Sequence, residues 1–225
     1  MTVLSLPALR RKNASQFQLS LVTNTQTFQS PLNKSVQTYE LPGARWQLTA
    51  TFENLGELDA RMLKAWIAKL RGAAGRFYCS DLSHKRPNGK AIGAGTVYGA
   101  GQAGTSIISA WMIPLATADS TILTADIDTF SIDASAGNVP LWLLPGDYCN
   151  INGELKIITD IVPLDNQGHA TLSFAPPLRA IPADGSPIII SAPTAVFRLN
   201  DDQQDKFNFN PDRHPTVTIT AQEVF

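Results

Sequence analysis

The chain has 225 residues, 16% of them charged, and a formal net charge of −1 at pH 7. A chain of this length forms one large or two modest domains and buries roughly 70% of its unfolded surface, so it folds without a metal or a disulfide. Its near-neutral charge argues against nucleic-acid binding, which requires a basic surface, and no stretch approaches the ~20 apolar residues of a membrane span.

The first predicted strand is residues 15–23, where Phe17, Leu19 and Leu21 share one face with the period of a half-buried strand. The next segment, residues 24–39, is polar and has too little apolar content for a core of its own. We interpret it as a long hairpin arm or a loop that leads into the following strand. A connection of that size is often functional or becomes ordered against a partner.

Residues 44–52 predict a second strand with one buried face, because apolar and polar residues alternate along it. The apolar positions are Trp46, Leu48, Ala50 and Phe52. From residue 53 to residue 72 the period changes to that of one amphipathic helix with a single apolar stripe. The stripe comprises Leu58, Met62, Leu63, Trp66, Ile67 and Leu70.

The ends of this helix have recognisable signals. Asn54 is the expected N-cap, with Glu57 three residues later, and Gly72 is the expected C-terminal glycine. Phe77 and Cys79 then indicate another strand. Because a single helix between two strands must lay its stripe on a sheet, we expect the core to form here.

From Gly89 the sequence becomes rich in Gly and Ala, which indicates a crossing between domains. Within residues 141–178, Asn152-Gly153 predicts a tight hairpin turn, and residues 166–168 (Asn-Gln-Gly) predict another. Short strands separated by such turns, in a block with few helical signals, predict a small closed or half-closed β-barrel.

The last residues read as strand again, because Val217, Ile219 and Ala221 alternate with threonines. Such a strand needs a sheet to join, and we expect the one formed by residues 1–88, since chain ends commonly lie close together. The predicted organisation is therefore a discontinuous domain with an inserted β-barrel domain. The discontinuous domain is residues 1–92 and 193–225, and the insertion is residues 93–192. The predicted fold class is mainly β (α+β), with one amphipathic helix.

Two motifs suggest chemistry by their letters. Residues 99–104 match GxGxxG, but a dinucleotide site also needs a buried strand before it and a helix after it, and neither is indicated. Cys79 and His84 could form a thiol–base pair, but no third group is marked to hold the base. We interpret the glycines as turn residues, Cys79 as a core residue and His84 as a loop residue.

Other reactive side chains are scattered. The histidines, His84, His169 and His214, lack zinc-ligand spacing. The aspartates Asp201, Asp202 and Asp205 lack the glycine and final Glu of a calcium loop, which favours a solvated turn. Cys79 and Cys149 have no CxxC partner and are interpreted as buried thiols in a reducing compartment. We predict that the protein is not an enzyme and has no catalytic, cofactor-binding or metal-binding residues.

Several stretches resemble a known family. Residues 43–89 (GARWQLTATFENLGELDARMLKAWIAKLRGAAGRFYCSDLSHKRPNG) resemble tail proteins of long-tailed bacteriophages, as do residues 97–107 (VYGAGQAGTSI) and 143–179 (LLPGDYCNINGELKIITDIVPLDNQGHATLSFAPPLR). VFRL at residues 196–199 and TITAQEV at 218–224 are similar to the end of the family pattern. The chain departs from that pattern in carrying Phe207, Phe209 and His214-Pro215 where the family often has a Trp and a Tyr-Gly pair.

The resemblance implies a distal tail protein, a virion structural protein of the tail tip that is assembled in the host cytoplasm. It implies a six-fold ring of identical copies, with the tail tube protein above and baseplate hub or tip proteins below. It also implies a tail-tube-like β-sandwich or barrel in the ring domain, and an OB-like or lectin-like insertion. In such a ring, the polar segment 24–39 of one copy is expected to lie on its neighbour.

The alternative function is a carbohydrate-binding module that contacts the host cell surface through the inserted barrel, since OB-like folds bind oligosaccharides. A sugar site requires exposed aromatic side chains, and most aromatic residues of the insertion are spaced like core residues. They are Tyr98, Trp111, Phe130, Trp142, Tyr148 and Phe174.

Overall fold

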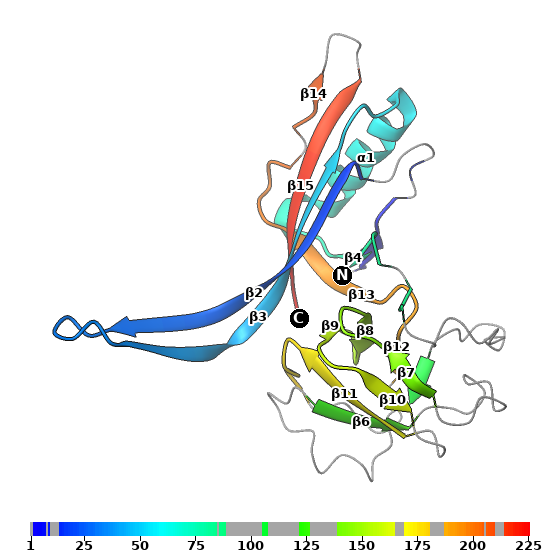
Figure 1. The fold of residues 1–225 in the computed structure, drawn as a ribbon. Helices are drawn as coiled ribbons and strands as arrows, with labels where there is room; N and C mark the ends of the chain where they lie inside the picture. The colour runs from blue at the N-terminus through cyan, green and yellow to red at the C-terminus, as the bar shows by residue number, and fades with distance from the viewer. Residues whose placement is uncertain are drawn as a thin grey trace. The chain divides into compact units, whose positions relative to one another are not determined.

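The computed structural model describes residues 2–7, 9, 14–84, 86–88, 105–107, 122–126, 139–164, 169–180, 187–204, 206–209 and 214–225. The described chain is mainly β, with two sheets and one α-helix (Figure 1). At this level the predicted fold class is confirmed.

The chain divides into two compact units. Unit 1 is residues 1–77 and 197–224, and unit 2 is residues 78–196 with residue 225. The first change of unit lies before the predicted boundary at residue 92, and the second lies after the predicted boundary at residue 193. Each unit has its own packing and is described by itself.

The first sheet joins strands from both ends of the sequence. In hydrogen-bonded order it contains β1 (Leu4–Ser5), β4 (Phe77–Ser80), β13 (Thr194–Leu199), β15 (Pro215–Glu223), β3 (Val36–Phe52) and β2 (Gln16–Gln29), and β14 (Asn208–Phe209) pairs with β15. The antiparallel pairing of β15 with β3 confirms that the last strand joins the N-terminal sheet. Both changes of unit fall inside strands, in β4 and in β13.

The alternation of apolar and polar residues predicted for residues 44–52 corresponds to one buried face of β3 in the structure. Trp46, Leu48, Ala50 and Phe52 of β3 are buried, and the register aligns this face with the buried residues of β15. Those residues are Val217, Ile219 and Ala221. The opposite face carries the threonines, and the hydroxyls of Thr51 and Thr218 lie 3.1 Å apart.

Helix α1 (Glu57–Leu70) covers the buried face and is followed by a short 3-10 turn, η1 (Gly72–Ala74). Trp66 of α1 meets Phe77 of β4 edge-to-face, with ring centroids 5.1 Å apart, and the Trp66 indole N–H donates to the Ser5 carbonyl at 2.8 Å. Phe77 also stacks on Phe197 of β13, with centroids 6.0 Å apart. These contacts tie the helix to the N-terminal segment and to two strands.

The predicted apolar stripe of α1 was too wide. Leu63, Trp66, Ile67 and Leu70 are buried, whereas Leu58 and Met62 are exposed. At about 100° per residue the six positions span about 180° of the helix, and the sheet covers only the part from Trp66 to Ile67. Asp59 lies within the part of the helix surface that the sheet covers, so its side chain is buried, whereas Leu58 and Met62 lie outside that part.

Both predicted helix caps were also wrong. The residue before the helix is Gly56, and no side chain caps it. Asn54 lies too early because Leu55, which is buried and donates its N–H to the Pro215 carbonyl, stands between it and the helix. At the other end Arg71 adopts the left-handed conformation, with φ 55°.

Gly72 follows Arg71, one residue later than the cap, and also has a positive φ of 66°. A Cβ atom at this position would collide with the carboxylate of Asp202. That carboxylate accepts the Ala73 N–H at 2.8 Å, so the glycine lets the loop after β13 approach the end of the helix.

The second sheet lies entirely within unit 2. Its hydrogen-bonded order is β6 (Ile122–Asp126), β5 (Thr105–Ile107), β12 (Pro187–Ile189), β8 (Tyr148–Ile151), β9 (Glu154–Ile158), β11 (His169–Ala175), β10 (Val162–Leu164) and β7 (Val139–Leu143). β6 pairs with β11 as well as with β5, so pairings can be followed from β11 through β9, β8, β12, β5 and β6 back to β11.

The predicted hairpin at Asn152-Gly153 is confirmed. Both residues have a positive φ, 51° and 85°, and Ile151 pairs with Glu154 across the turn. Two consecutive positive φ values are the requirement of the tight hairpin turn that Asn-Gly favours. The second predicted turn, residues 166–168, lies outside the described residues, and the strands on either side of it, β10 and β11, are antiparallel.

Candidate assembly surface

Strands β2 and β3 continue together beyond the sheet as a long hairpin, which resolves the two interpretations of residues 24–39 (Figure 1). Six cross-strand pairs run from Asn24 opposite Leu41 to Gln29 opposite Val36. β15 pairs with β3 only between residues 47 and 52, so in the described structure the outer strands pair only with each other. We call residues 24–41 the arm. The root comprises residues 16–22 and 45–52.

A bulge separates the root from the arm. Between the Val22–Arg45 pair and the Asn24–Leu41 pair, one residue of β2 stands opposite three residues of β3. Gly43 has a φ of 113°, which favours glycine, and the Asn24 side-chain amide donates to a backbone carbonyl of this bulge at 3.0 Å. Bulges bend and twist a strand, so this one redirects the arm relative to the sheet.

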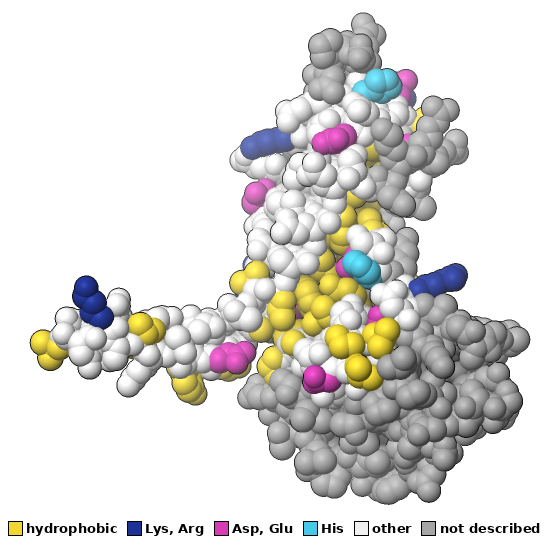
Figure 2. Space-filling model, in the orientation of Figure 1, with side chains coloured by type: hydrophobic (Ala, Val, Ile, Leu, Met, Phe, Trp, Pro, Cys, Tyr) yellow, Lys and Arg dark blue, Asp and Glu magenta, His cyan; other side chains and the backbone are white. Residues whose placement is uncertain are grey.

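The arm exposes apolar side chains that a free hairpin cannot bury. The exposed fractions are 56% for Phe28, 96% for Leu32, 56% for Val36 and 64% for Tyr39. Figure 2 shows hydrophobic side chains spaced along this projection, with few charged side chains among them. The only charged residues of the arm are Lys34, which lies in the turn, and Glu40.

The register sorts the arm into two faces. Phe28 stands opposite Gln37, and Tyr39 stands opposite Gln26, so the two aromatic residues share one face as diagonal neighbours. The other face carries Thr27 opposite Thr38. One face of the arm is therefore aromatic and the other is rich in threonine.

The edge of the hairpin is also open in the described structure, because β2 is the last strand of its sheet. β2 has 14 residues, none charged and none proline, so it lacks the usual features that prevent edge-to-edge association. An isolated two-stranded hairpin is marginally stable in water. An exposed arm of this kind is suited to binding another protein chain.

Cys79 and His84, which the sequence indicates to be a core residue and a loop residue, have different partners in the structure. The buried Cys79 thiol contacts the Ser80 carbonyl at 3.4 Å, whereas His84 Nδ1 lies 3.3 Å from the Asp81 carboxylate. Burial is the main cause that raises the pKa of Tyr148 to about 12, and the charge and hydrogen bond of Asp81 add to it. The Asp81 carboxylate thus links His84 and Tyr148 in unit 2.

Cys149 is fully buried in β8. Burial raises the pKa of its thiol to about 12; the positive charge of Lys156 acts in the opposite direction, and the negative charge of Asp147 adds to the increase. The thiol therefore stays protonated at neutral pH, and a protonated thiol is a poor nucleophile. Both cysteines are buried and free of disulfides, as the sequence indicated.

Two charged residues of β9 are buried, which the sequence did not predict. Lys156 is fully buried and donates to Glu154 at 2.6 Å and to the Pro177 carbonyl at 2.8 Å. Arg179 Nη1 lies 3.6 Å from the same Glu154 carboxylate, and the Lys156 ammonium lies 5.8 Å from the Phe174 ring centroid. Charged residues at alternate positions beside a turn normally lie on a solvated face. The sequence around Glu154 and Lys156 therefore did not indicate that these two residues are buried. It fixes residues 177–179 against the strand.

The remaining candidate residues do not converge. Asp201 and Asp202 are exposed and accept backbone N–H groups, and Asp205 is outside the described residues. His169 begins β11, and His214 Nδ1 lies 3.3 Å from the Leu55 carbonyl in unit 1. Among the described residues, no group of three or more His, Cys, Asp or Glu side chains could hold a metal ion.

The GxGxxG residues 99–104 lie outside the described residues, as do Tyr98, Trp111 and Phe130. Trp142 lies in β7, Phe174 is buried, and Tyr148 is partly buried. No helix in the described part of the chain is long and apolar enough to span a membrane. The most distinct surface feature of the described structure is thus the arm.

No protein-family model matches the chain, and no curated protein matches it.

Proposed function

We propose that this chain is a structural protein of a bacteriophage tail, a distal tail protein that forms a six-fold ring between the tail tube and the baseplate or receptor-binding tip. The observation that carries the proposal is the arm, which projects from a well-packed sheet and exposes Phe28, Leu32, Val36 and Tyr39. The resemblance of residues 43–89 to phage tail proteins supplies the biological setting.

The physical step from arm to ring is a heterologous contact. An arm that binds a different surface on the next copy repeats the same contact around the assembly, and a suitable rotation closes it. Burial of the exposed aromatic and aliphatic residues stabilises such a contact by roughly 25 cal/mol for each Å² of apolar surface removed from water. The tail tube protein on one face and hub or tip proteins on the other are the further partners, at the tip of a virion assembled in the host cytoplasm.

The same proposal assigns the fold of the two parts. Residues 1–92 and 193–225 would form the tail-tube-like ring domain, and residues 93–192 an inserted OB-like β-barrel. The helix-covered sheet of unit 1 supports the first assignment. The return of the strand pairings from β11 to itself through β5 and β6 supports the second.

The test shortens the arm. Replacing residues 26–37 with Asn-Gly leaves Asn, Gly, Thr38 and Tyr39 between the Thr25–Glu40 pair, a loop length that hairpins accept. We expect the shortened chain to remain a folded monomer and to lose the ring. Light scattering and electron microscopy of the purified protein, with incorporation into tails scored in parallel, measure both properties.

A matched control changes the threonine face of the intact arm, with Thr27→Ser and Thr38→Ser. These residues pair with each other on the face opposite Phe28, so the control should keep the ring. Normal assembly of the shortened chain would contradict the role of the arm. A wild-type protein that forms no ring, alone or on tail-tube ends, would contradict the proposed function as a whole.

A further inference from the structure

Among the described residues assigned to unit 1, the exposed large hydrophobic side chains lie on two elements; Tyr78 of β4, which is 44% exposed, is in the same sheet but is assigned to unit 2. One is the β2–β3 hairpin, with Val22, Phe28, Leu32, Val36 and Tyr39, and the other is helix α1, with Leu58 and Met62. Scattered single apolar residues are normal on a protein surface. Their restriction to one hairpin and one helix face of unit 1 is a more specific pattern.

The exposed residues of α1 form a continuous strip. Leu58 is 59% exposed, Met62 is 41% exposed, and the exposed Ala65 extends the line by less than one turn. Positions separated by three and four residues are neighbours on a helix surface. Arg61, which pairs with Glu57 at 2.6 Å, borders the strip. The helix thus has a second apolar face, outside the arc that the sheet covers.

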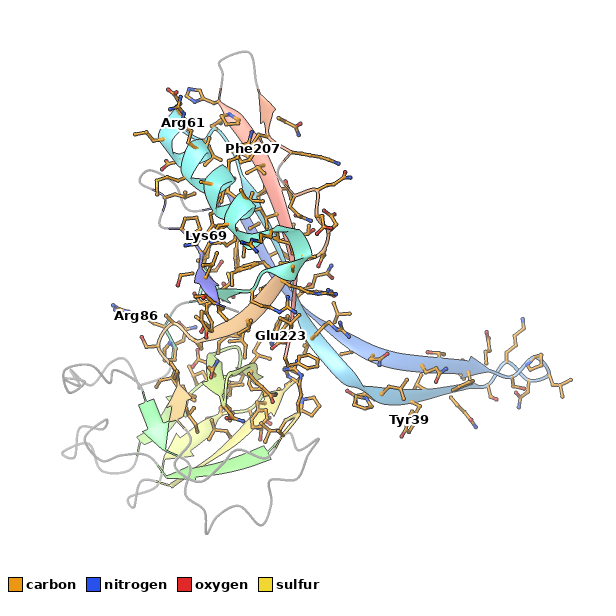
Figure 3. All side chains as sticks on the ribbon, turned by 180° about the vertical axis from the view of Figure 1, so that it is seen from behind. Tyr39, Arg61, Lys69, Arg86, Phe207 and Glu223 are labelled. Atoms are coloured by element: carbon orange, nitrogen blue, oxygen red, sulfur yellow. The ribbon has the colours of Figure 1, made fainter. Side chains whose placement is uncertain are left out.

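The arm cannot cover the helix of its own chain. Figure 3 shows Tyr39 on the arm and Arg61 on α1 at opposite ends of unit 1, and Figure 1 shows the same separation of the two elements. Both elements are assigned to unit 1. Burying both apolar surfaces against each other therefore requires two copies of the chain.

We propose that the arm of one copy docks on the Leu58–Met62–Ala65 strip of helix α1 in the next copy. This inference rests on the proposed ring and names the surface that receives the arm. Two different surfaces meet in the contact, as a closed ring requires. The aromatic face with Phe28 and Tyr39 suits a methionine, because thioether–aromatic contacts are favourable.

The first test is site-specific cross-linking in the full-length chain. Tyr39→Cys and Met62→Cys are combined in one variant, in which the native Cys79 and Cys149 are buried and do not compete. Under mild oxidation we expect disulfide-linked ladders that extend to the full ring. Each single variant should give no ladder, and Thr27→Cys combined with Met62→Cys, on the other face of the arm, should give much less.

The second test is Met62→Lys, which places a charge in the strip without touching the core. We expect an unchanged denaturation midpoint for the monomer and a rise of about tenfold or more in the concentration at which half of the protein is assembled. If the wild-type ring forms while the cross-link fails and Met62→Lys assembles normally, the docking site is wrong and the proposed ring stands. If the wild-type protein forms no ring under any condition, the proposed function fails and this inference fails with it.

Discussion

The root and the arm of the β2–β3 hairpin are built from the same two strands, but their environments differ. In the root, Trp46, Leu48 and Phe52 are at most 2% exposed, because α1 and β15 cover one face and one edge. In the arm, Phe28 and Tyr39 are more than half exposed on a ribbon that pairs only with itself in the described structure. Apolar side chains thus serve the monomer in one half of the hairpin, and in our proposal they serve the assembly in the other.

This difference separates two kinds of stability. The buried β3 residues of the root contribute to the free energy of unfolding of one chain, because they are buried before any partner binds. Arm residues contribute little to that free energy and lose their exposed surface only on association. Substitutions in the two halves should therefore divide cleanly between unfolding and assembly measurements.

The largest expected effect on monomer stability comes from a substitution in helix α1, which packs on the sheet that contains the root. Trp66→Ala should lower the free energy of unfolding of unit 1 by about 3–5 kcal/mol, as truncations of large buried aromatic residues do. The substitution removes the edge-to-face contact with Phe77 and the hydrogen bond from the indole N–H to Ser5. Chemical denaturation monitored by far-UV circular dichroism measures the change.

The matched control for this substitution lies on the same helix. Met62→Ala removes a side chain outside the arc that the sheet covers, so it should cost less than about 1 kcal/mol. A loss below about 1 kcal/mol for Trp66→Ala as well would reject the packing of α1 on the sheet.

A smaller effect is expected where the root ends. The Glu223 side chain is buried and accepts the backbone N–H of Trp46 at 3.1 Å. Glu223→Ala removes this acceptor and should cost about 1–3 kcal/mol, the range for leaving a buried hydrogen-bond donor unsatisfied. Glu223→Gln keeps an oxygen acceptor and should cost less. Equal denaturation midpoints for wild type and Glu223→Ala would show that this contact adds nothing to the root.

How much of this fold can be predicted depends on how clearly the sequence pattern distinguishes buried positions from exposed ones. The strict alternation around Trp46 and Ile219 gave the correct strands and faces, because a half-buried strand has a period of two. Asn152-Gly153 gave the correct turn, because few residue pairs accept two positive φ values. Such local signals do not depend on the rest of the molecule.

The errors came from positions that the tertiary structure decides. Leu58 and Met62 fit a helical stripe, and only the width of the sheet shows that they are outside the core. Glu154 and Lys156 fit a solvated face, and only their contacts with each other and with residues 177–179 show that they are buried. The arm has no buried face, so its polar sequence is equally compatible with a hairpin and with a loop, and only the cross-strand register shows that it is a hairpin.

The smallest effect on monomer stability is expected in the arm. Phe28→Ala should change the free energy of unfolding by no more than about 0.5 kcal/mol, because the side chain is 56% exposed in the monomer. Phe52→Ala is the matched control, since the same residue type is 2% exposed in the root of the same hairpin and should cost about 3–5 kcal/mol. Ring assembly should respond in the opposite order. At a temperature where both variants are folded, Phe28→Ala should weaken assembly measured by light scattering, and Phe52→Ala should assemble as wild type does. A large loss of monomer stability in Phe28→Ala would mean that the arm packs on its own chain, and the division between root and arm would fail.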